Sequence, residues 1–315
     1  MKIAIIGATG ETGRSVVNGL LNAEDNFEIT ALIRPPSLPK RGVQDLKSRG
    51  VKVLPVDLNE ISHNVLVGNL KGTDVVISTI HYQSLSDEIV LVNAAKDARV
   101  ARYVPCFWAT VAARGVMGLR DAKEEILDHV QRLRLPYTAI DVGWWYQISL
   151  PPVPSGKLDY ALMAPQSTYS IFGDGDNPSA MTDLRDIGLY VAKIIGDERT
   201  INQRVLAATE TWTQNEIAGI VERVTEEEVA VTKVPDADIN AKVNELRASN
   251  AGLNQERATY EYFNSWGVRG DNTVENARYL GYLIFDDLYP GVKGRGFEEF
   301  IKEALDGKIQ KVYGA

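Results

Sequence analysis

The sequence predicts an α/β fold in which a doubly wound parallel sheet carries a second, smaller α+β lobe. Three observations support this prediction. Short apolar runs alternate with amphipathic segments through the first half of the chain. The first run leads directly into a glycine-rich loop, and the pattern changes after Leu150. Alternating strands and helices imply right-handed crossovers, which give a parallel sheet with helices on both faces.

The apolar runs that predict strands recur at short intervals. The first covers residues 2–6, and five more follow at 28–34, 51–57, 74–80, 101–106 and 137–143. The segments between them have the apolar spacing of amphipathic helices, and they lie at 15–21, 43–49, 61–70, 86–98 and 119–133. Because ligands of a doubly wound sheet bind at the carboxyl ends of its strands, we expect the functional residues there.

The chain changes character after Leu150, where a proline-rich stretch leaves the last predicted strand. Residues 163–195 predict a strand pair joined by a Gly-Asp-Gly-Asp-Asn turn, followed by a helix capped by Thr182 or Asp183. From about residue 236 the pattern is helical and aromatic. We therefore expect a sheet domain at 1–150 and a lobe at 151–315, with segments near 180–210 returning to the sheet.

The overall composition is that of a globular protein with an excess of acidic groups. Of 315 residues, 44% are hydrophobic, and the formal net charge is −8. This charge argues against nucleic-acid binding, which needs clustered Lys and Arg. No apolar run reaches the roughly 20 residues of a membrane span, and no signal peptide is recognised. The single cysteine, Cys106, excludes an internal disulfide, so we expect a cytoplasmic protein.

The loop after the first run carries glycines at three-residue spacing, Gly7, Gly10 and Gly13. A strand, a glycine loop and a helix in this order are typical of a Rossmann-type dinucleotide site. The glycines would permit the turn, the approach of a pyrophosphate and close packing of the helix, whose first N–H groups would face the phosphates. A glycine turn without a ligand is the alternative. The other loop residues assigned to the cofactor are Thr9, Glu11 and Thr12.

The residue after the second strand indicates which nucleotide is bound. An acidic residue there would bind the ribose of NAD, whereas an arginine accommodates the 2′-phosphate of NADP. The strand ends in Arg34, so the sequence favours NADPH (NADP⁺), with a solvent-facing basic loop as the alternative. Further cofactor contacts are expected at the ends of neighbouring strands, from Asp57, Thr79 and Ile80.

A lysine on the helix after the fifth strand is the candidate catalytic residue. Conventional short-chain dehydrogenases carry Tyr-x-x-x-Lys, in which the lysine lowers the pKa of the tyrosine. Here Lys123 has Leu119, not tyrosine, at that spacing. An exposed helical lysine paired with a nearby acid is the alternative, because charged residues flank it on both sides.

Several stretches resemble the fungal isoflavone-reductase-like branch of the NmrA-like family, a group of atypical short-chain dehydrogenases. They include GATGETG, RYVPC, LPYTAIDVGWWYQISLP, TDLRDIG and YFNSWGVRGDNTVENARYLGYLIFDDLYPG. The resemblance covers nearly the whole chain. It implies a Rossmann-type NADPH domain, a substrate lobe and reduction of small, often aromatic or polyketide-like metabolites. It also implies that Lys123 contacts the nicotinamide ribose and takes part in proton transfer.

One segment departs from the family pattern. After RYVPC the family usually continues with an acidic residue, Phe and Gly, whereas this chain has Phe107, Trp108 and Ala109. We expect Phe107 and Trp108, together with Trp144 and Trp145, to line an apolar substrate site. Packing in the core is the alternative for these rings.

Two further side chains are candidate proton donors. Tyr146 follows the two tryptophans, and its hydroxyl could bind a substrate carbonyl, while His81 follows the fourth strand. A structural role is the alternative for each. The other two histidines have no metal-ligand spacing with carboxylates or with Cys106, so no metal site is predicted.

The combined prediction is an NADPH-dependent oxidoreductase that reduces a carbonyl or enone of a small hydrophobic, aromatic or polyketide-type metabolite. One alternative is a catalytically silent, NADP-sensing regulator. Another is a non-redox isomerase, cyclase or dehydratase on the same scaffold. The expected partner is a small-molecule substrate, with no nucleic acid and no membrane, and a homodimer is left open.

Overall fold

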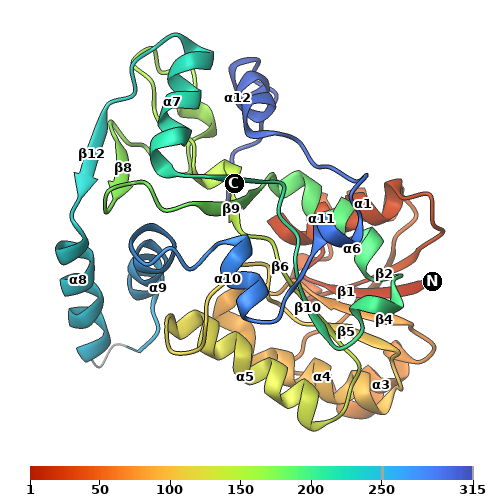
Figure 1. Ribbon diagram of the computed structural model, residues 1–315. Helices are drawn as coiled ribbons and strands as arrows, with labels where there is room; N and C mark the ends of the chain where they lie inside the picture. Colours follow the sequence, from red (N-terminus) through yellow and green to blue (C-terminus); the bar gives the residue numbers. More distant parts are fainter. Residues whose placement is uncertain (250–251, 314–315) are drawn as a thin grey trace. The chain divides into compact units, whose positions relative to one another are not determined.

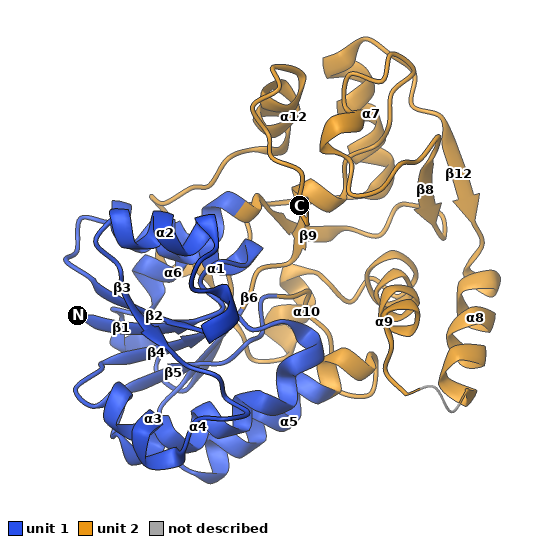
Figure 2. Cartoon of the chain, turned by 180° about the vertical axis from the view of Figure 1, so that it is seen from behind, with its two compact units in different colours: residues 1–108, 122–140, 185–205 blue, residues 109–121, 141–184, 206–315 orange. Residues whose placement is uncertain are grey.

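The computed structural model describes residues 1–249 and 252–313. The chain forms two compact units (Figure 2). Unit 1 comprises residues 1–108, 122–140 and 185–205, and unit 2 comprises residues 109–121, 141–184 and 206–315. Unit 2 contains somewhat more of the chain than unit 1, whereas the sequence suggested a smaller second lobe. The chain passes between the units several times, so the domain boundary at residue 150 stays a prediction.

The sheet of unit 1 has five parallel strands in the order β3-β2-β1-β4-β5 (Figure 1). The strands are β1 (Lys2–Ile6), β2 (Glu28–Ile33), β3 (Lys52–Pro55), β4 (Val75–Ser78) and β5 (Arg102–Val104). Their near-continuous apolar runs suit a sheet that is covered on both faces. β1 is the central strand: β2 and β3 follow on one side of it, and the chain then crosses to the other side, where it forms β4 and β5. This topology confirms the predicted doubly wound parallel sheet.

Helices cover both faces of this sheet (Figure 1). On one face, α1 (Glu11–Asn22) packs against α6 (Ile187–Ile194), where Gly188 N donates to Ser15 Oγ at 3.1 Å. The opposite face is covered by α3 (His63–Leu70), α4 (Glu88–Asp97) and α5 (Gly118–Arg132). The short α2 (Arg41–Ser48) follows β2. The predicted helical segments therefore form helices in the order expected.

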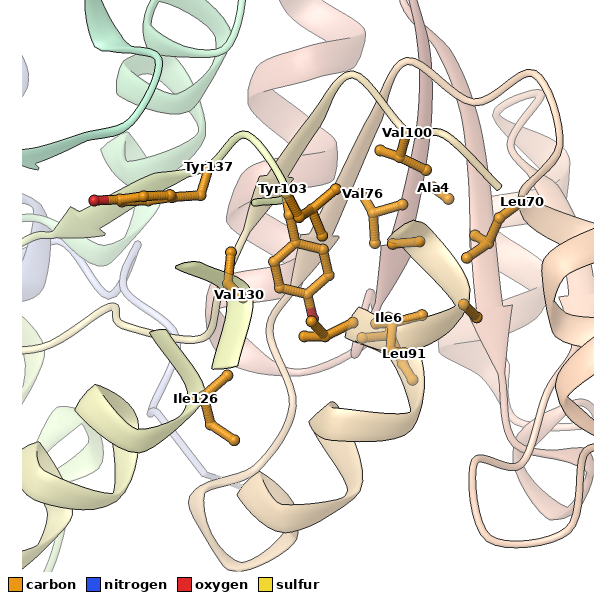
Figure 3. Packing of buried hydrophobic residues seen from close by; sticks show 14 of the residues in the cluster. Ala4, Ile6, Leu70, Val76, Leu91, Val100, Tyr103, Ile126, Val130 and Tyr137 are labelled. Carbon is orange, nitrogen blue, oxygen red and sulfur yellow. The ribbon is translucent and has the colours of Figure 1, made fainter. Parts of the chain in front are cut away.

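The core of unit 1 lies between the sheet and helices α3 to α5 (Figure 3). Ile6 and Val76 from the strands pack in one buried cluster with Leu91 of α4 and Val130 of α5. Each fully buried aliphatic side chain of this size stabilises the fold by about 1.5–3 kcal/mol. Tyr103 lies in the same cluster with no exposed surface. A phenol in such a place requires a buried hydrogen-bond partner.

Two further strands, β6 (Thr138–Asp141) and β10 (Gln203–Leu206), follow β5. A parallel bridge between Tyr103 and Tyr137 links β5 to the start of β6, and β10 lies beside β6. Buried Arg102 fastens the segment before β10 by donating to the carbonyls of Ile194 and Asp197, both at 2.9 Å. Residues 185–205 therefore belong to unit 1.

Unit 2 combines small sheets with helices. β9 (Ser179–Thr182) lies between β7 (Trp144–Trp145) and β11 (Glu210–Trp212), whereas β8 (Tyr169–Phe172) pairs with β12 (Val231–Val234). Because β8 and β9 join different sheets, the predicted strand pair around the glycine turn is wrong. The intervening loop is instead held by Asn215 of α7 (Gln214–Thr225), whose side-chain amide donates to the carbonyl of Asp174 and to the carboxylate of Asp176.

The rest of unit 2 is mainly helical, as the C-terminal pattern predicts. Its remaining elements are α7 (Gln214–Thr225), α8 (Asp236–Ala248), α9 (Gln255–Tyr262), a π-helical turn (Phe263–Val268), α10 (Val274–Tyr279), β13 (Leu283–Ile284), α11 (Phe285–Leu288) and α12 (Phe297–Leu305). Within residues 1–249 and 252–313, no helix has the length and apolarity needed to cross a membrane.

The helix after β9 begins later than the sequence suggested. A 3₁₀ turn at Leu184–Asp186 precedes α6, and Asp186 occupies the N-cap position. The prediction that Thr182 or Asp183 caps this helix is therefore wrong. Thr182 still belongs to β9, and the carboxylate of Asp183 accepts a hydrogen bond from Gln147 at 2.8 Å.

Candidate active site

The glycine loop after β1 is closed so tightly that two of its positions exclude any side chain. Gly7 has φ +79°, and a Cβ there would lie 2.3 Å from the carbonyl oxygen of Thr79. A Cβ on Gly13 would lie 2.1 Å from the carbonyl oxygen of Gly7. A hydrogen bond from Gly10 N to Gly7 O at 2.9 Å closes the turn. The first and third glycines therefore have the turn and packing roles that the sequence predicts.

The start of α1 leaves main-chain donors available for an anion. Gly10 is the N-cap and has no side chain to accept from the first-turn N–H groups, and Thr9 and Gly10 are exposed. Glu11 and Thr12, the first two residues of the helix, are partly buried, and Glu11 pairs with Arg14. Uncapped N–H groups at the positive end of a helix dipole fit a pyrophosphate. These residues thus suit the dinucleotide that the sequence predicts.

The remaining predicted cofactor residues lie at the carboxyl ends of β2, β3 and β4. Arg34 is exposed directly after β2, at the start of a short 3₁₀ turn. Asp57 is partly buried and accepts from Asn59 N at 3.0 Å. Thr79 is buried, and its hydroxyl donates to the carbonyl of Ile6 at 2.8 Å, whereas Ile80 is partly exposed. Their contacts with a cofactor stay predictions, and Thr79 in addition fastens the glycine loop.

Lys123 is buried, although it lies on a helix with many charged residues. The side chain of Lys123 extends from α5 to the end of β5, where Nζ donates to the carbonyls of Cys106 at 2.8 Å and of Phe107 at 2.5 Å. The neighbouring Glu124 pairs with Arg204 instead. The alternative of an exposed, acid-paired lysine at this position is therefore wrong. An ammonium group has three donors, and two of them here are directed at main-chain oxygens.

The segment that holds Lys123 is a strained turn. Phe107 N donates to Pro105 O at 2.8 Å, and Trp108 has φ +36°, a left-handed conformation that is rare for a bulky residue. The turn is fixed by Trp108 Nε1, which donates to the carbonyl of Ser78 at 2.7 Å. Phe107 and Trp108 are both buried. Their burial favours the packing alternative, and substrate contact by these rings stays a prediction.

A buried carboxyl group, which the sequence analysis did not single out, lies behind this turn. Glu88, the first residue of α4, has no exposed surface. Its Oε1 accepts from Tyr103 Oη at 2.9 Å and from Cys106 N at 3.1 Å. Burial raises the pKa of Glu88 to about 7, although both donors, the Ser78 hydroxyl and the charge of Lys123 lower it. The available signal was periodicity, since Glu88 shares a helix face with buried Leu91.

The cysteine at this turn is not a reactive thiol. Cys106 is buried and its Sγ donates to the carbonyl of Ile80 at 3.2 Å. Burial raises the pKa of the Cys106 thiol to about 12, with Lys123 lowering it and Glu88 raising it. A thiol of this pKa stays protonated at neutral pH and makes a poor nucleophile.

The other predicted proton donors occupy different surroundings. His81 is exposed at the end of β4 and packs its ring 4.5 Å from that of Tyr82. Tyr146 is fully buried in unit 2, where its hydroxyl donates to Glu210 at 2.9 Å and its ring contacts Phe297. This environment favours a structural role for Tyr146. Proton donation by either residue stays a prediction.

The tryptophan pair of β7 is half-buried in unit 2. Trp144 packs against Tyr262 and Trp266 with ring centroids 5.6 and 5.0 Å apart, and Trp145 stacks on Tyr313. Both rings thus have packing partners, and their contact with a substrate stays a prediction. Within the described part of the chain, no group of three His, Cys, Asp or Glu side chains could hold a metal ion.

Comparison with known proteins decides the family. The model of the NmrA-like family matches residues 1–301. The chain belongs to the NmrA-like family. This confirms the resemblance, and it agrees with the parallel sheet and the glycine loop of unit 1.

Curated relatives cover almost the full chain. The asnovolin J 5′,6′-dehydrogenase of Aspergillus novofumigatus is 44% identical over 316 residues, which cover 98% of this chain and 96% of that protein. An isoflavone reductase-like protein of Olea europaea is 27% identical, over 96% of this chain and 98% of that protein. The prediction of an isoflavone-reductase-like oxidoreductase agrees with the names of these relatives.

Solved structures share the fold. The complex of leucoanthocyanidin reductase with NADPH from Vitis vinifera superposes with a TM-score of 0.82 at 21% identity, covering 97% of this chain and 100% of that one. An isoflavone reductase structure superposes with a TM-score of 0.79 at 23% identity. The superposition covers 96% of this chain and 98% of that one. These likenesses confirm the predicted α/β fold, with its Rossmann-type sheet.

Proposed function

We propose that this chain is an NADPH-dependent oxidoreductase that acts on a small hydrophobic metabolite, with Lys123 as its catalytic residue. The observation that carries the proposal is the placement of the Lys123 ammonium. It lies at the carboxyl end of β5, in the same sheet whose β1 leads into the glycine loop. Ligands of doubly wound sheets bind along this edge.

The residues of unit 1 fit a dinucleotide. The first turn of α1 and the loop at Thr9 and Gly10 would hold the pyrophosphate through main-chain N–H groups. Arg34 would hold the 2′-phosphate through its guanidinium fork. When bound, the nicotinamide supplies or accepts a hydride. That NADPH is the cofactor is supported by the Vitis vinifera complex, whose fold this chain shares.

Lys123 manages the proton that accompanies the hydride. Its two bonds to main-chain carbonyls fix Nζ and leave one N–H of the ammonium for a hydroxyl or a substrate oxygen. A positioned ammonium stabilises negative charge that develops on a substrate oxygen, and it can donate a proton to it. The position of the conventional catalytic tyrosine, four residues before Lys123, is occupied by Leu119, which cannot donate a proton.

The names of the relatives support a substrate class for the proposal. The names of the curated relatives include a dehydrogenase of asnovolin J and reductases of isoflavone type. We propose a carbonyl or enone group on an aromatic or polyketide-type metabolite as the reacting centre. The paired positions in the name of the 44% identical relative favour redox chemistry at a carbon–carbon bond, which an enone contains.

One alternative has a specific observation in its favour. A catalytically silent NADP sensor would need the glycine loop but no proton donor, and Leu119 at the position of the conventional tyrosine suits it. The other alternative, a non-redox isomerase, cyclase or dehydratase, would convert the metabolite without changing the nicotinamide. Both differ from the proposal in one respect, because neither oxidises NADPH.

The experiment is a screen of ketones and enones, followed through nicotinamide absorbance, in which NADPH and NADP⁺ are each offered to the full chain. The proposal expects oxidation of NADPH with at least one enone, or reduction of NADP⁺ with its saturated product. Tight NADPH binding without turnover on any metabolite would favour the sensor. Conversion of a metabolite, detected by mass spectrometry of the same reactions, with unchanged nicotinamide absorbance would favour the non-redox enzyme.

A further inference from the structure

The carboxyl group of Glu88 is fixed at the back of the turn that holds Lys123. Its Oε1 accepts from the main-chain N–H of Cys106 at 3.1 Å, and the carbonyl of the same residue accepts from Lys123 Nζ at 2.8 Å. Two hydrogen bonds that share Cys106 therefore link the carboxyl group to the ammonium. A second donor, Tyr103 Oη at 2.9 Å, orients the carboxyl group from β5.

The turn itself depends on outside support. Trp108 is in the left-handed region with φ +36°, and a bulky residue in this region costs of order 1–3 kcal/mol. Its main-chain N–H donates to Ile140 O at 3.0 Å and its indole donates to Ser78 O. Together with the bond from Cys106 N to Glu88, these contacts hold the strained segment on both sides. Strained segments held in this way concentrate at functional sites.

The second oxygen of this carboxyl group makes no hydrogen bond of ordinary geometry. Glu88 Oε2 and Ser78 Oγ are both buried without such a partner among the described residues, although the Ser78 hydroxyl is near enough to lower the pKa of Glu88. Buried polar groups are nearly always paired, so an unpaired carboxyl oxygen calls for a functional explanation. A proton on Oε2 would give this atom a donor and would remove its negative charge.

We propose that Glu88 is a positioning residue, whose carboxylate fixes the Cys106–Phe107 turn and thereby holds the Lys123 ammonium in its working place. Protonation of Glu88 removes its attraction for Lys123 and loosens the turn. The inference rests on the proposed role of Lys123 as the residue that manages the proton.

The groups that face Glu88 allow it to titrate alone near neutral pH. They are Ser78 from β4, Tyr103 from β5, Cys106 at the end of β5 and Lys123 from α5. Burial raises the pKa of Tyr103 well above its usual value and that of Cys106 to about 12, so both stay neutral. The pKa of Glu88 itself is raised to about 7, so its charge changes within the working range of an enzyme.

The test compares kcat of wild type and Glu88→Gln across pH with NADPH and the metabolite identified in the screen. Glutamine keeps an oxygen that accepts from Tyr103 and from Cys106 N, but it carries no charge. We expect the two proteins to match below about pH 6 and wild type to be about tenfold faster at about pH 8, because displacement of a catalytic group costs rate. KM and NADPH affinity should stay unchanged.

Two further variants sharpen this test. Tyr103→Phe removes a donor that lowers the pKa of Glu88, so the wild-type inflection should move to higher pH. Glu261→Gln alters a buried carboxylate of unit 2, and its pH profile should parallel that of wild type. An inflection that persists in Glu88→Gln, or equal rates of wild type and Glu88→Gln at all pH values, would overturn the inference.

A second readout does not depend on turnover. Acetic anhydride labelling of Lys123, followed by mass spectrometry, reports how firmly the ammonium is held. We expect Lys123 to label several-fold faster in Glu88→Gln than in wild type at about pH 8, and equally fast below about pH 6. Equal labelling at both pH values overturns the inference. If Lys123 labels faster in Glu88→Gln than in wild type at about pH 8 but the wild-type chain neither binds nor oxidises NADPH, the proposed function is overturned and the Glu88 coupling stands.

Discussion

Glu88 of unit 1 and Glu261 of unit 2 are both buried glutamates, and their carboxylates have opposite surroundings. In unit 2, both oxygens of Glu261 are engaged: Oε1 accepts from Arg247 and Arg257, and Oε2 accepts from Gly118 N. Burial raises the pKa of Glu261, but these donors outweigh it and lower the pKa overall. In unit 1, Oε1 of Glu88 accepts from two neutral donors, Tyr103 Oη and Cys106 N, whereas Oε2 makes no hydrogen bond of ordinary geometry. Burial raises the pKa of Glu88 to about 7.

The difference separates a carboxylate that stabilises unit 2 from one to which we assign a positioning role. Glu261 contributes stability, because its charge is balanced by two arginines and it fastens the start of α5. Glu88 costs stability at neutral pH, because its charge is buried with incomplete compensation. Proteins keep such unfavourable groups where activity needs them. The comparison therefore supports our proposal of a site at the carboxyl edge of the sheet in unit 1.

Removal of the Lys123 ammonium should have the largest effect. We expect Lys123→Ala to lower kcat by about 10²–10⁴-fold, the usual contribution of a positioned acid or base, while NADPH binding is retained. Lys302→Ala, at an exposed lysine of α12 paired with Glu298, should be silent. Undiminished turnover in Lys123→Ala would exclude the role of this lysine in proton transfer.

The glycine loop should tolerate no side chain where it packs on itself. Gly13→Ala would place a Cβ 2.1 Å from Gly7 O, so we expect a loss of about 3 kcal/mol of unfolding free energy and a loss of NADPH binding. Gly68→Ala in α3 meets no atom within 4 Å, and it should leave binding intact while stabilising the helix by up to about 1 kcal/mol. Equal unfolding midpoints of the two variants in urea would contradict the packing described.

Glu88→Gln should be more stable than wild type, and the difference in unfolding free energy should grow as pH rises. The folded pKa of about 7 lies above the ordinary 4.5, so the cost of the buried charge is absent at low pH and complete above about pH 7. We expect Glu88→Gln to unfold with a free energy at most about 3 kcal/mol larger than wild type at about pH 8, and equal to it below about pH 4.5. Urea titrations at a series of pH values measure this difference.

Glu261→Gln should be less stable than wild type at neutral pH, by a smaller difference in unfolding free energy. Its folded pKa is lowered from 4.5, so its contribution is present above the unfolded pKa and is lost as pH falls through the folded pKa. Glu261→Gln should cost about 2 kcal/mol of unfolding free energy at neutral pH, and the difference from wild type should shrink in acid. If both variants shifted stability in the same direction at about pH 8, the contrast between the units would be wrong.

The sequence predicted the parts of this molecule that depend on local pattern. The doubly wound sheet follows from alternating strands and helices, and Gly7 and Gly13 occupy the close approaches expected of them. Lys123 was found by its place on the helix after β5. The burial of Lys123 could not be predicted, because its ammonium is bound by two main-chain carbonyls 16 and 17 residues away and not by the acidic partner that its neighbours suggested.

What the sequence could not show depends on tertiary contacts. Glu88 and Tyr103 lie 15 residues apart, so helical periodicity could place Glu88 on the buried face of α4, but it could not show which donors its carboxyl group meets there. The left-handed turn at Trp108 is equally hidden, since its φ of +36° is fixed by Ser78 from another strand. The strand pair expected around residue 174 failed for the same reason, because β8 and β9 find partners elsewhere in unit 2.

The most direct test of the account is calorimetric titration of wild type and Arg34→Ala with NADPH and with NADH. The account predicts that wild type binds NADPH tightly and prefers it to NADH. Arg34→Ala should weaken NADPH binding by about tenfold or more, the effect of losing a charge-assisted hydrogen bond to a phosphate, and leave NADH binding unchanged. Absence of binding by either nucleotide to wild type would contradict the account at its base, because the glycine loop would then hold no dinucleotide.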